Sequence, residues 1–316
     1  MKILITGGAG CLGSSLVERY IMMGHELLVL DNFATSTRAG IRATRNLVLV
    51  EGTIADAALV DKCFAEFSPT HVIHSAAAYK APDNWTEDIA TNVQGAVNVA
   101  HAALKYQVKR VVNFQTALVY GTPEIVPIPV EHRIAPISSY GISKAAGEVY
   151  LNMIAGEIPY TSLRLANICG PRLAIGPIPT FYQRIKAGKP CYCSDTVRDF
   201  LDMEDFHTLM DKVMEDAATS GMFNVSTGEG RSIKQLFDVI AQYLEHVPDQ
   251  PIRIVPPGID DVKNIVLDPK RTQAVFGWQS KIGFEETITR VLRWYDEHGV
   301  TDIFSHLAAP VAGKTE

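Results

Sequence analysis

Tyr140 and Lys144 stand four residues apart, in the run Tyr140-Gly141-Ile142-Ser143-Lys144. On a helix, residues at i and i+4 share one face, so the phenol and the ammonium would be neighbours. A positive charge beside a phenol lowers the phenol pKa, because it stabilises the phenolate. A phenolate poised near neutral pH can take a proton from a hydroxyl group. The spacing therefore indicates acid–base chemistry on an alcohol.

A second hydroxyl lies upstream, at the end of a predicted strand over 110–114. In the run Phe114-Gln115-Thr116-Ala117-Leu118, Thr116 comes just after that strand. We expect its hydroxyl at the active edge of a sheet, where it could share a hydrogen bond with the substrate oxygen. A Tyr-x-x-x-Lys pair alone is common on exposed helix faces, so the interpretation depends on what surrounds it.

The N-terminal segment supplies those surroundings. It holds a predicted strand over 2–6, the turn Gly-Gly-Ala-Gly-Cys-Leu-Gly over 7–13, and a helical pattern from about Ser14 to Met23. Gly7 permits a sharp turn, Gly10 lets the backbone approach a pyrophosphate, and Gly13 lets the helix pack close to the strand. The helix N-terminus then directs N–H groups and its dipole at the phosphates. The pattern predicts a dinucleotide site, although a tight turn without a ligand has the same composition.

Asp31 ends the next predicted strand, which covers residues 27–30. A carboxylate at that position can bond both hydroxyls of the adenosine ribose, and it would repel a 2′-phosphate. The sequence therefore favours NAD over NADP.

The elements that must position these residues alternate between strands and helices. This alternation predicts an α/β fold, a Rossmann-type doubly wound parallel sheet with helices on both faces. Further strands are expected over 47–50, 71–74, 110–114 and 161–165, and helices over 57–67, 87–106, 140–155, 203–216, 233–244 and 284–298. We expect residues 1–166 to form the NAD-binding domain, with later segments near 200–216 returning to it. Residues 167–316, interrupted by Pro171, Pro177, Pro179 and Pro190, are expected mainly to form a smaller mixed substrate-binding lobe.

The composition restricts the class of protein. The 316 residues are 47% hydrophobic and 20% charged, with a net charge of −6 and a pI of about 5.9, so neither nucleic acid nor an anionic membrane is an expected partner. No apolar run approaches the roughly 20 residues of a membrane span. The odd, scattered cysteines and the strand beginning at Lys2 favour a cytoplasmic protein without a signal peptide. Cys191-Tyr192-Cys193 lacks a second ligand pair, so no metal site is expected.

Taken together, these motifs resemble the extended short-chain dehydrogenase/reductase family of NAD-dependent sugar-nucleotide epimerases and dehydratases, over nearly the whole chain to about Tyr295. Within it, the chain looks most like UDP-hexose 4-epimerase-type enzymes of bacterial surface-polysaccharide (O-antigen) biosynthesis. The motifs that carry the resemblance are Thr6…Gly13, Asp31-Asn32, Asn92, Thr116…Gly121, Tyr140…Lys144, Asn167…Arg172 and Arg198-Asp199-Phe200…Asp205.

The resemblance implies roles for matching residues. Tyr140 would be the catalytic base and acid, Lys144 would bond the nicotinamide ribose, and Thr116 would assist at the reacting hydroxyl. Asp31 and Asn32 would hold the adenosine ribose. The residues expected to bind NAD are Gly7, Gly10, Cys11, Leu12, Gly13, Asp31, Asn32, Thr53, Ile54, Ser75, Ala76, Ala77, Asn92, Tyr140 and Lys144. Those expected to bind substrate are Lys80, Thr116, Asn167 and Arg198, the last by neutralising a phosphate of the nucleotide sugar.

Two departures from the family pattern weaken these expectations locally. The usual Gly-Asp after the third strand, which bonds adenine, is replaced by Gly52-Thr53, so the Thr53 hydroxyl or backbone would have to take the contact. An Arg-x-Gly-Asp segment that clamps the diphosphate in many members reads Pro-Pro-Gly-Ile-Asp over 256–260 and lacks the arginine. Lys80, Arg172 and Arg198 could face the cleft, which is compatible with a uronic acid sugar, although a diphosphate alone explains them.

The two residues after Thr116 indicate the type of reaction. Dehydratases of the family carry an Asp-Glu pair there, and decarboxylases a glutamate, whereas this chain has Ala117 and Leu118, which cannot transfer protons. We expect epimerisation of a UDP-sugar at C4 through a transient 4-keto intermediate. The alternatives are a sugar-nucleotide dehydrogenase or reductase, a dehydratase, epimerisation at another carbon, and a non-catalytic dinucleotide binder.

The resemblance also implies a homodimer, formed by the helices over 87–106 and 140–155. The small apolar run from Ala96 to Leu104 could line that interface or pack on the sheet.

Overall fold

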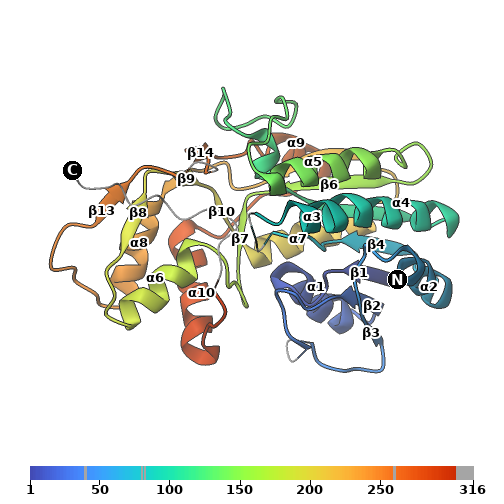
Figure 1. Ribbon diagram of the computed structural model, residues 1–316, viewed down its shortest axis with the longest axis horizontal. Coiled ribbons are helices and arrows are strands. Elements are labelled where there is room, and N and C mark those ends of the chain that lie inside the picture. The colour runs from blue at the N-terminus through green and yellow to red at the C-terminus, as the bar shows by residue number, and fades with distance from the viewer. Residues whose placement is uncertain (39–40, 80, 82, 259–260, 304–316) are drawn as a thin grey trace.

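The computed structural model describes residues 1–38, 41–79, 81, 83–258 and 261–303. A parallel sheet lies at its centre, with helices covering both faces, and a smaller lobe lies beyond one end of the sheet (Figure 1). Among the described residues no helix is both long and apolar enough to cross a bilayer.

Within those residues the central sheet has seven strands, in the order β11-β6-β5-β4-β1-β2-β3, and all neighbours pair in parallel. The order reverses between β1 and β4, which is where such sheets bind ligands. Valine, isoleucine and leucine fill these strands because both faces of the sheet are buried. The Rossmann-type prediction is confirmed. The strands are β1 (Lys2–Thr6), β2 (Glu26–Asp31), β3 (Leu47–Glu51), β4 (His71–His74), β5 (Arg110–Thr116), β6 (Tyr160–Leu165) and β11 (Gly221–Val225).

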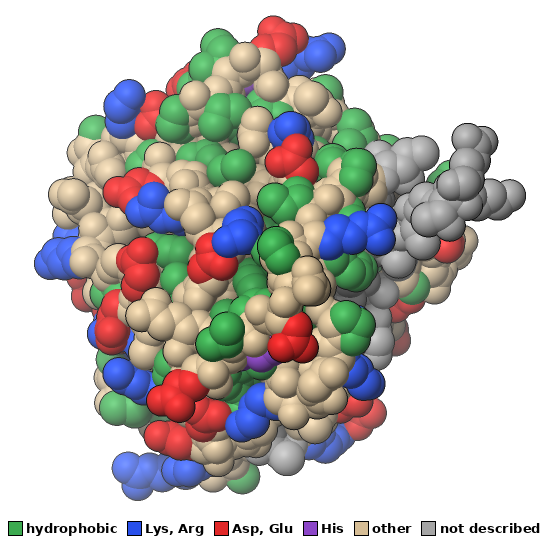
Figure 2. All heavy atoms as spheres, turned by 90° about the vertical axis from the view of Figure 1, so that its left-hand side faces the viewer, with side chains coloured by type: hydrophobic (Ala, Val, Ile, Leu, Met, Phe, Trp, Pro, Cys, Tyr) green, Lys and Arg blue, Asp and Glu red, His purple; other side chains and the backbone are tan. Residues whose placement is uncertain are grey.

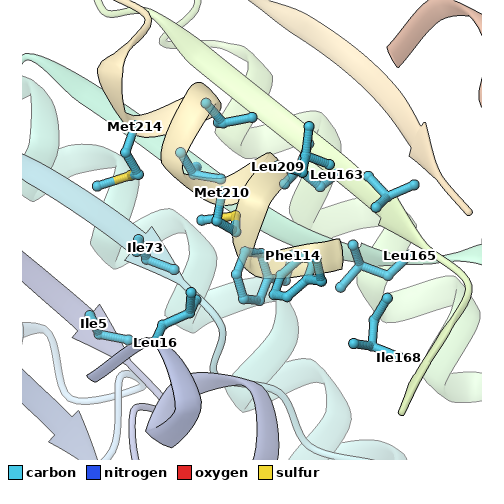
Figure 3. Close-up of a cluster of buried hydrophobic side chains, with 14 of the residues drawn as sticks. Ile5, Leu16, Ile73, Phe114, Leu163, Leu165, Ile168, Leu209, Met210 and Met214 are labelled. Atoms are coloured by element: carbon cyan, nitrogen blue, oxygen red, sulfur yellow. The ribbon is translucent and has the colours of Figure 1, made fainter. Parts of the chain in front are cut away.

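A separate hydrophobic cluster covers each face of the sheet. On one face α1 (Cys11–Met22), α7 (Met203–Glu215) and α9 (Lys270–Phe276) contribute to the cluster. Figure 3 shows Ile5 of β1 and Leu16 of α1 on the same side of the sheet as Phe114, Leu209 and Met210. The other face is covered by α2 (Ala57–Phe67), α4 (Gly95–Lys105) and α5 (Ser139–Asn152).

The smaller lobe packs α6 (Pro177–Lys186), α8 (Ile233–Tyr243) and α10 (Phe284–His298) around a third cluster. Three small sheets of short strands accompany these helices. They pair β7 (Asn167–Cys169) with β10 (Phe200–Asp202), β8 (Tyr192–Ser194) with β13 (Arg253–Val255), and β9 (Val197–Arg198) with both β12 (Arg231–Ser232) and β14 (Asn264–Ile265). The expectation that prolines interrupt this region is wrong for α6. Pro177 and Pro179 lie in its first turn. The N–H groups there have no hydrogen-bond partner within the helix, so a residue without an N–H is tolerated.

Two further elements differ from the sequence-based expectation. β11 joins the central sheet beside β6, so the return to the sheet extends beyond residue 216. The helix predicted over 87–106 is helical but not uniform: α3 (Trp85–Asp88) is followed by a π-helical segment, η2 (Ile89–Gln94), before α4. A π-helical turn inside an α-helix commonly marks a functional site. Here it carries Asn92, whose carbonyl oxygen would lie 2.2 Å from a Cβ added at Gly147 of α5.

Helix α1 begins at Cys11, three residues before the predicted start, and this places Gly13 inside its first turn. A Cβ added at Gly13 would lie 2.3 Å from the Gly7 carbonyl oxygen and 2.6 Å from the Gly8 Cα. Those neighbours are backbone and cannot rotate away. The close contact between helix and turn therefore requires glycine at this position.

We expect Gly13→Ala to lower the free energy of unfolding by about 1–3 kcal/mol, because a methyl group is forced into a packed contact. The displaced turn should also weaken NAD binding. Thermal unfolding and calorimetric NAD titration would measure both effects. Gly156→Ala is the matched control, since a Cβ there would meet nothing within 4 Å. Equal stability and affinity in the two variants would contradict the packing argument.

Candidate active site

A cavity of about 710 Å³ lies at the carboxyl ends of the central strands and extends to α6 and β8 of the smaller lobe. It is lined by the β1–α1 turn, the loop after β4, the end of β5, helix α5 and residues of the smaller lobe. On the face that Figure 2 shows, acidic and basic side chains are interspersed rather than gathered by sign. The structure thus offers an elongated site that suits a large ligand better than an extended charged partner.

The glycine turn forms one end of this cavity. Gly7 has a φ of +66°, and a Cβ added there would lie 2.6 Å from the Ala76 Cα, so the turn packs directly on the loop after β4. Gly10, Cys11 and Leu12 line the cavity, and Gly10 caps α1 without a side-chain hydrogen bond to its first turn. Helix N–H groups without a capping side chain, next to backbone lacking Cβ atoms, fit the pyrophosphate of a dinucleotide. Gly13 lies behind this wall and does not line the cavity.

Asp31 both lines the cavity and holds the glycine turn. Its Oδ2 accepts a hydrogen bond from the Ala9 N–H at 2.8 Å, and its Oδ1 accepts from the Phe33 N–H at 2.8 Å and the Ser36 hydroxyl at 3.2 Å. Asn32 lines the cavity beside it. Sequence reasoning assigned Asp31 to ribose alone. The structure adds a positioning role, because this one carboxylate joins the turn to the end of β2.

The remaining residues expected to bind cofactor surround the cavity on two sides. Thr53 and Ile54 line it after β3, and the Thr53 hydroxyl oxygen accepts a hydrogen bond from the Ala55 N–H at 3.2 Å. The loop over 75–77 lines it after β4, held by a 3.3 Å hydrogen bond from the Ala76 N–H to the Thr6 hydroxyl.

Asn92 does not reach the cavity. Its Oδ1 accepts from the Ala78 N–H at 2.9 Å, and its Nδ2 donates to the Ala78 carbonyl at 2.9 Å and the Ser143 hydroxyl at 3.0 Å. These bonds use the buried amide to tie the loop after β4 to α5. Asn92 thus supports the site through these bonds, and its expected contact with the cofactor stays a prediction.

Thr116, Tyr140 and Lys144 come together on one wall of the cavity. Thr116 ends β5 and caps the 3-10 helix η3 (Ala117–Tyr120), accepting a 3.2 Å hydrogen bond from the Leu118 N–H. Tyr140 and Lys144 occupy the first turns of α5, which Ser138 caps. The Lys144 ammonium donates to the Phe114 carbonyl at 2.7 Å, so helix and strand are joined at the site itself.

Burial dominates the electrostatics of this wall. It raises the pKa of Tyr140, with contributions from Tyr79 and Asp88, while a hydrogen bond with Thr116 acts in the opposite direction. Burial lowers the pKa of Lys144 to about 8, against the attraction of Glu148. The net pKa shift of Tyr140 is thus opposite to the one expected from the Tyr-x-x-x-Lys spacing, because desolvation of the phenol outweighs the hydrogen bond with Thr116.

Asn167 and Arg198, the residues expected to bind substrate, both line the cavity. Arg198 forms an ion pair with Asp261, and the two side chains are only 12% and 11% exposed. The two acids nearest to Arg198 in the sequence, Asp195 and Asp199, do not form this pair. Asp195 instead pairs with Lys263 at 2.8 Å, and the Asp199 carboxylate accepts hydrogen bonds from residues 227 and 228.

Two other cations were considered from the sequence, Arg172 and Lys80. Arg172 pairs with Glu18 and does not line the cavity. Lys80 lies outside the described residues. Arg184 of α6 does line the cavity, donating to the Pro190 carbonyl, and sequence reasoning missed it. A helix placed from Pro177 onward, on the grounds that proline suits a first turn, would have identified it.

Comparison with known proteins identifies relatives along the whole chain. Residues 3–226 match the NAD dependent epimerase/dehydratase family. The chain is 31% identical to UDP-glucose 4-epimerase of Mycolicibacterium smegmatis, over 93% of this chain and 98% of the relative. The Bordetella bronchiseptica enzyme WbmG, solved in complex with NAD, is 58% identical with a TM-score of 0.91, covering 98% of both chains. WbmG has also been solved with NAD and UDP. UDP-glucose 4-epimerase of Thermotoga maritima, solved with UDP-glucose, is 29% identical over 94% of this chain and 99% of that chain, with a TM-score of 0.86.

We expect Asp31→Ala to weaken NAD binding at least about tenfold, because it removes the acceptor that holds the glycine turn as well as the ribose ligand. Isothermal calorimetry with NAD measures the affinity. Asp56→Ala is the control: Asp56 caps α2 by accepting from the Leu59 N–H at 3.0 Å and does not line the cavity. It should cost about 1 kcal/mol of stability and leave NAD affinity unchanged. An Asp31→Ala variant that binds NAD like the wild type would refute this assignment.

Proposed function

Because the chain belongs to the NAD-dependent epimerase/dehydratase family, we propose that it is an enzyme that epimerises a UDP-linked sugar at C4 through a transient 4-keto intermediate. The membership makes NAD its cofactor. Relatives named UDP-glucose 4-epimerase, and the neighbour solved with NAD and UDP, support a UDP-sugar as substrate. The same relatives support reaction at C4, and the residues of the cavity wall bear on the type of reaction.

The observation that carries this proposal is the pairing of Thr116, Tyr140 and Lys144 with Ala117 and Leu118 on the same wall. The first three residues provide a base, a cation and a hydroxyl at one point. The next two are aliphatic, and neither can donate or accept a proton. Elimination of water needs an acid–base pair beyond the one that serves oxidation. Inversion at C4 needs only that the keto sugar turn over in the site, so that the hydride removed from one face returns to the other.

Tyr140, Thr116 and Lys144 each have a separate role in that inversion. When bound, NAD supplies the hydride acceptor and donor. The Tyr140 oxygen takes the proton of the C4 hydroxyl and later returns it, and Thr116 holds the same oxygen by a hydrogen bond. Lys144 keeps one donor on Phe114 and has two more for the ribose and the phenol. Because burial raises the pKa of Tyr140, forming the phenolate depends on positive charge nearby, and the same burial favours return of the proton.

The diphosphate of the substrate would enter beside Arg198 and Arg184. Arg198 is already paired with Asp261, so a bound diphosphate would compete with that carboxylate for the guanidinium. Arg184 bonds a backbone carbonyl and can turn toward an anion. These two arginines replace the clamp arginine that the segment over 256–260 lacks.

We also propose a homodimer built on α3, η2 and α5. The run from Ala96 to Leu104 is not its interface, because Ala96, Val99, Ala100 and Ala103 are buried in the cluster on the sheet side. Exposed apolar side chains lie elsewhere on these contacting elements, and such a patch on a helix pair typically marks an interface. They are Trp85, Ile89, Ile142, Val149, Tyr150 and Met153.

The experiment that tests the proposed function incubates the protein with a panel of UDP-sugars, neutral, N-acetylated and uronic, without added reductant. NMR identifies the products while absorbance at 340 nm reports NADH. We expect a C4 epimer without net NADH. Tyr140→Phe should lower turnover at least about a thousandfold with NAD still bound, since the acid–base step is lost. Tyr243→Phe, the same change on α8 at a position that does not line the cavity, should be neutral. Steady accumulation of NADH or of a keto product would contradict the proposed C4 epimerisation.

Val149→Asp should convert the dimer to a monomer, because it places a charge at a position that is 63% exposed in the isolated subunit and buried in the proposed interface. Sedimentation velocity at micromolar concentration measures the change. Val247→Asp, at an 86% exposed position after α8, controls for the added charge. A wild-type protein that sediments as a monomer would exclude the dimer.

A further inference from the structure

A buried ion pair lies directly behind the catalytic wall. Glu148 follows Lys144 by one turn of α5 and is 2% exposed. Its Oε2 lies 2.7 Å from an Nη of Arg164 on β6, and its Oε1 accepts a 2.6 Å hydrogen bond from the Ser162 hydroxyl. Neither charge touches the cavity. A buried pair is weak support for stability, since well-packed apolar residues often do as well, so its place beside the site needs another explanation.

The other side of Arg164 reaches the segment that follows Thr116. Its second Nη donates to the Tyr120 hydroxyl at 2.9 Å and to the Val130 carbonyl at 3.0 Å. Tyr120 closes η3, whose first residue follows Thr116, and its hydroxyl donates to the Asn224 Oδ1 on β11 at 2.8 Å. One guanidinium therefore bonds both the helix that carries Tyr140 and Lys144 and the segment that carries Thr116.

Gln115 makes a second link between α5 and the segment that carries Thr116, and this link lies next to Thr116 and Lys144 themselves. Its Nε2 donates to the Lys144 carbonyl at 2.8 Å, and its Oε1 accepts from the Thr116 N–H at 2.8 Å. Together with the bond from Lys144 to Phe114, these contacts fix the position of α5 along β5. Glu148 and Arg164 are the charged centre of the arrangement.

We propose that Glu148 and Arg164 are positioning residues for the catalytic wall: the pair holds α5 and the Thr116–Tyr120 segment in one register, and Glu148 is the countercharge of the buried Lys144 ammonium. This inference rests on the proposed function for its effect on turnover, but its charge component concerns Lys144 directly.

The groups around Lys144 leave Glu148 as its anionic partner. On α5 they are Tyr140 and Glu148, and from β4 the neighbour is His74, whose pKa burial lowers to about 3, so it is neutral. The loop after β4 brings Tyr79 against the Tyr140 ring, at 6.0 Å between centroids, and α3 brings Asp88, which bonds Ser139 and acts on Tyr140. Burial lowers the pKa of Lys144 to about 8 and Glu148 opposes that shift, so the ammonium deprotonates as pH rises through about 8.

The charge component is tested on the double variant Glu148→Gln/Arg164→Met, which removes both charges and leaves neither buried alone. The Lys144 titration is followed by the ¹³Cε signal of labelled lysine, assigned by comparison with Lys144→Arg. We expect its midpoint to fall by about one pH unit, because the Glu148 carboxylate raises the pKa of Lys144, whereas the Arg164 cation that is removed with it has no comparable effect on Lys144. The alkaline limb of kcat/KM should move by the same amount. Ser162→Ala keeps the pair and should leave both midpoints unchanged.

The positioning component is tested on Tyr120→Phe, which breaks the bond between Arg164 and the Thr116 segment and preserves the ion pair. We expect kcat to fall about tenfold with the KM, the NAD affinity and the Lys144 midpoint unchanged. This variant also keeps the inference testable if the double variant does not fold. A folded double variant with a wild-type Lys144 midpoint, or Tyr120→Phe with wild-type kcat, would overturn the corresponding component. If wild-type protein turns over no UDP-sugar, the proposed function fails while the lysine titration still decides the charge component.

Discussion

The contact between helix α5 and strand β5 is the constraint on which the site depends. The Lys144 ammonium donates to the Phe114 carbonyl, and the Gln115 amide donates to the Lys144 carbonyl, so helix and strand cannot slide past one another without breaking buried hydrogen bonds. Unpaired polar groups in such a place are costly. Thr116 at the end of β5 and Tyr140 on α5 are therefore held in a fixed relation on one wall of the cavity.

The same burial that fixes these positions also shifts the charges. It raises the pKa of Tyr140, lowers that of Lys144 to about 8, and lowers that of His74 to about 3. A wall that excludes water strengthens every charge interaction along it. The electrostatics of the cavity then depend on where opposite charges lie, which makes two ion pairs important: Glu148–Arg164 behind the wall and Arg198–Asp261 on the cavity lining.

The sequence pattern was sufficient to predict features that depend only on residues close together in the chain. The alternation of apolar runs predicted the strands of the central sheet other than β11 and most of the helices that cover it, and the glycine turn and Asp31 both line the cavity. It was insufficient where a residue's partner is distant in sequence. Asn92 bonds Ala78 and Ser143 instead of lining the cavity, Arg172 pairs with Glu18, and the prolines expected to interrupt α6 form its first turn.

The sequence by itself determined the elements, the glycine turn and the kinds of group available for proton transfer, because those depend on spacing within a single helix or strand. Only the tertiary structure decided the directions of the pKa shifts, the partner of Arg198 and the link from Glu148 through Arg164 to Tyr120. Each of these depends on burial or on a contact between segments far apart in the chain. Such contacts are set by how the sheet and the smaller lobe pack, which no local pattern encodes.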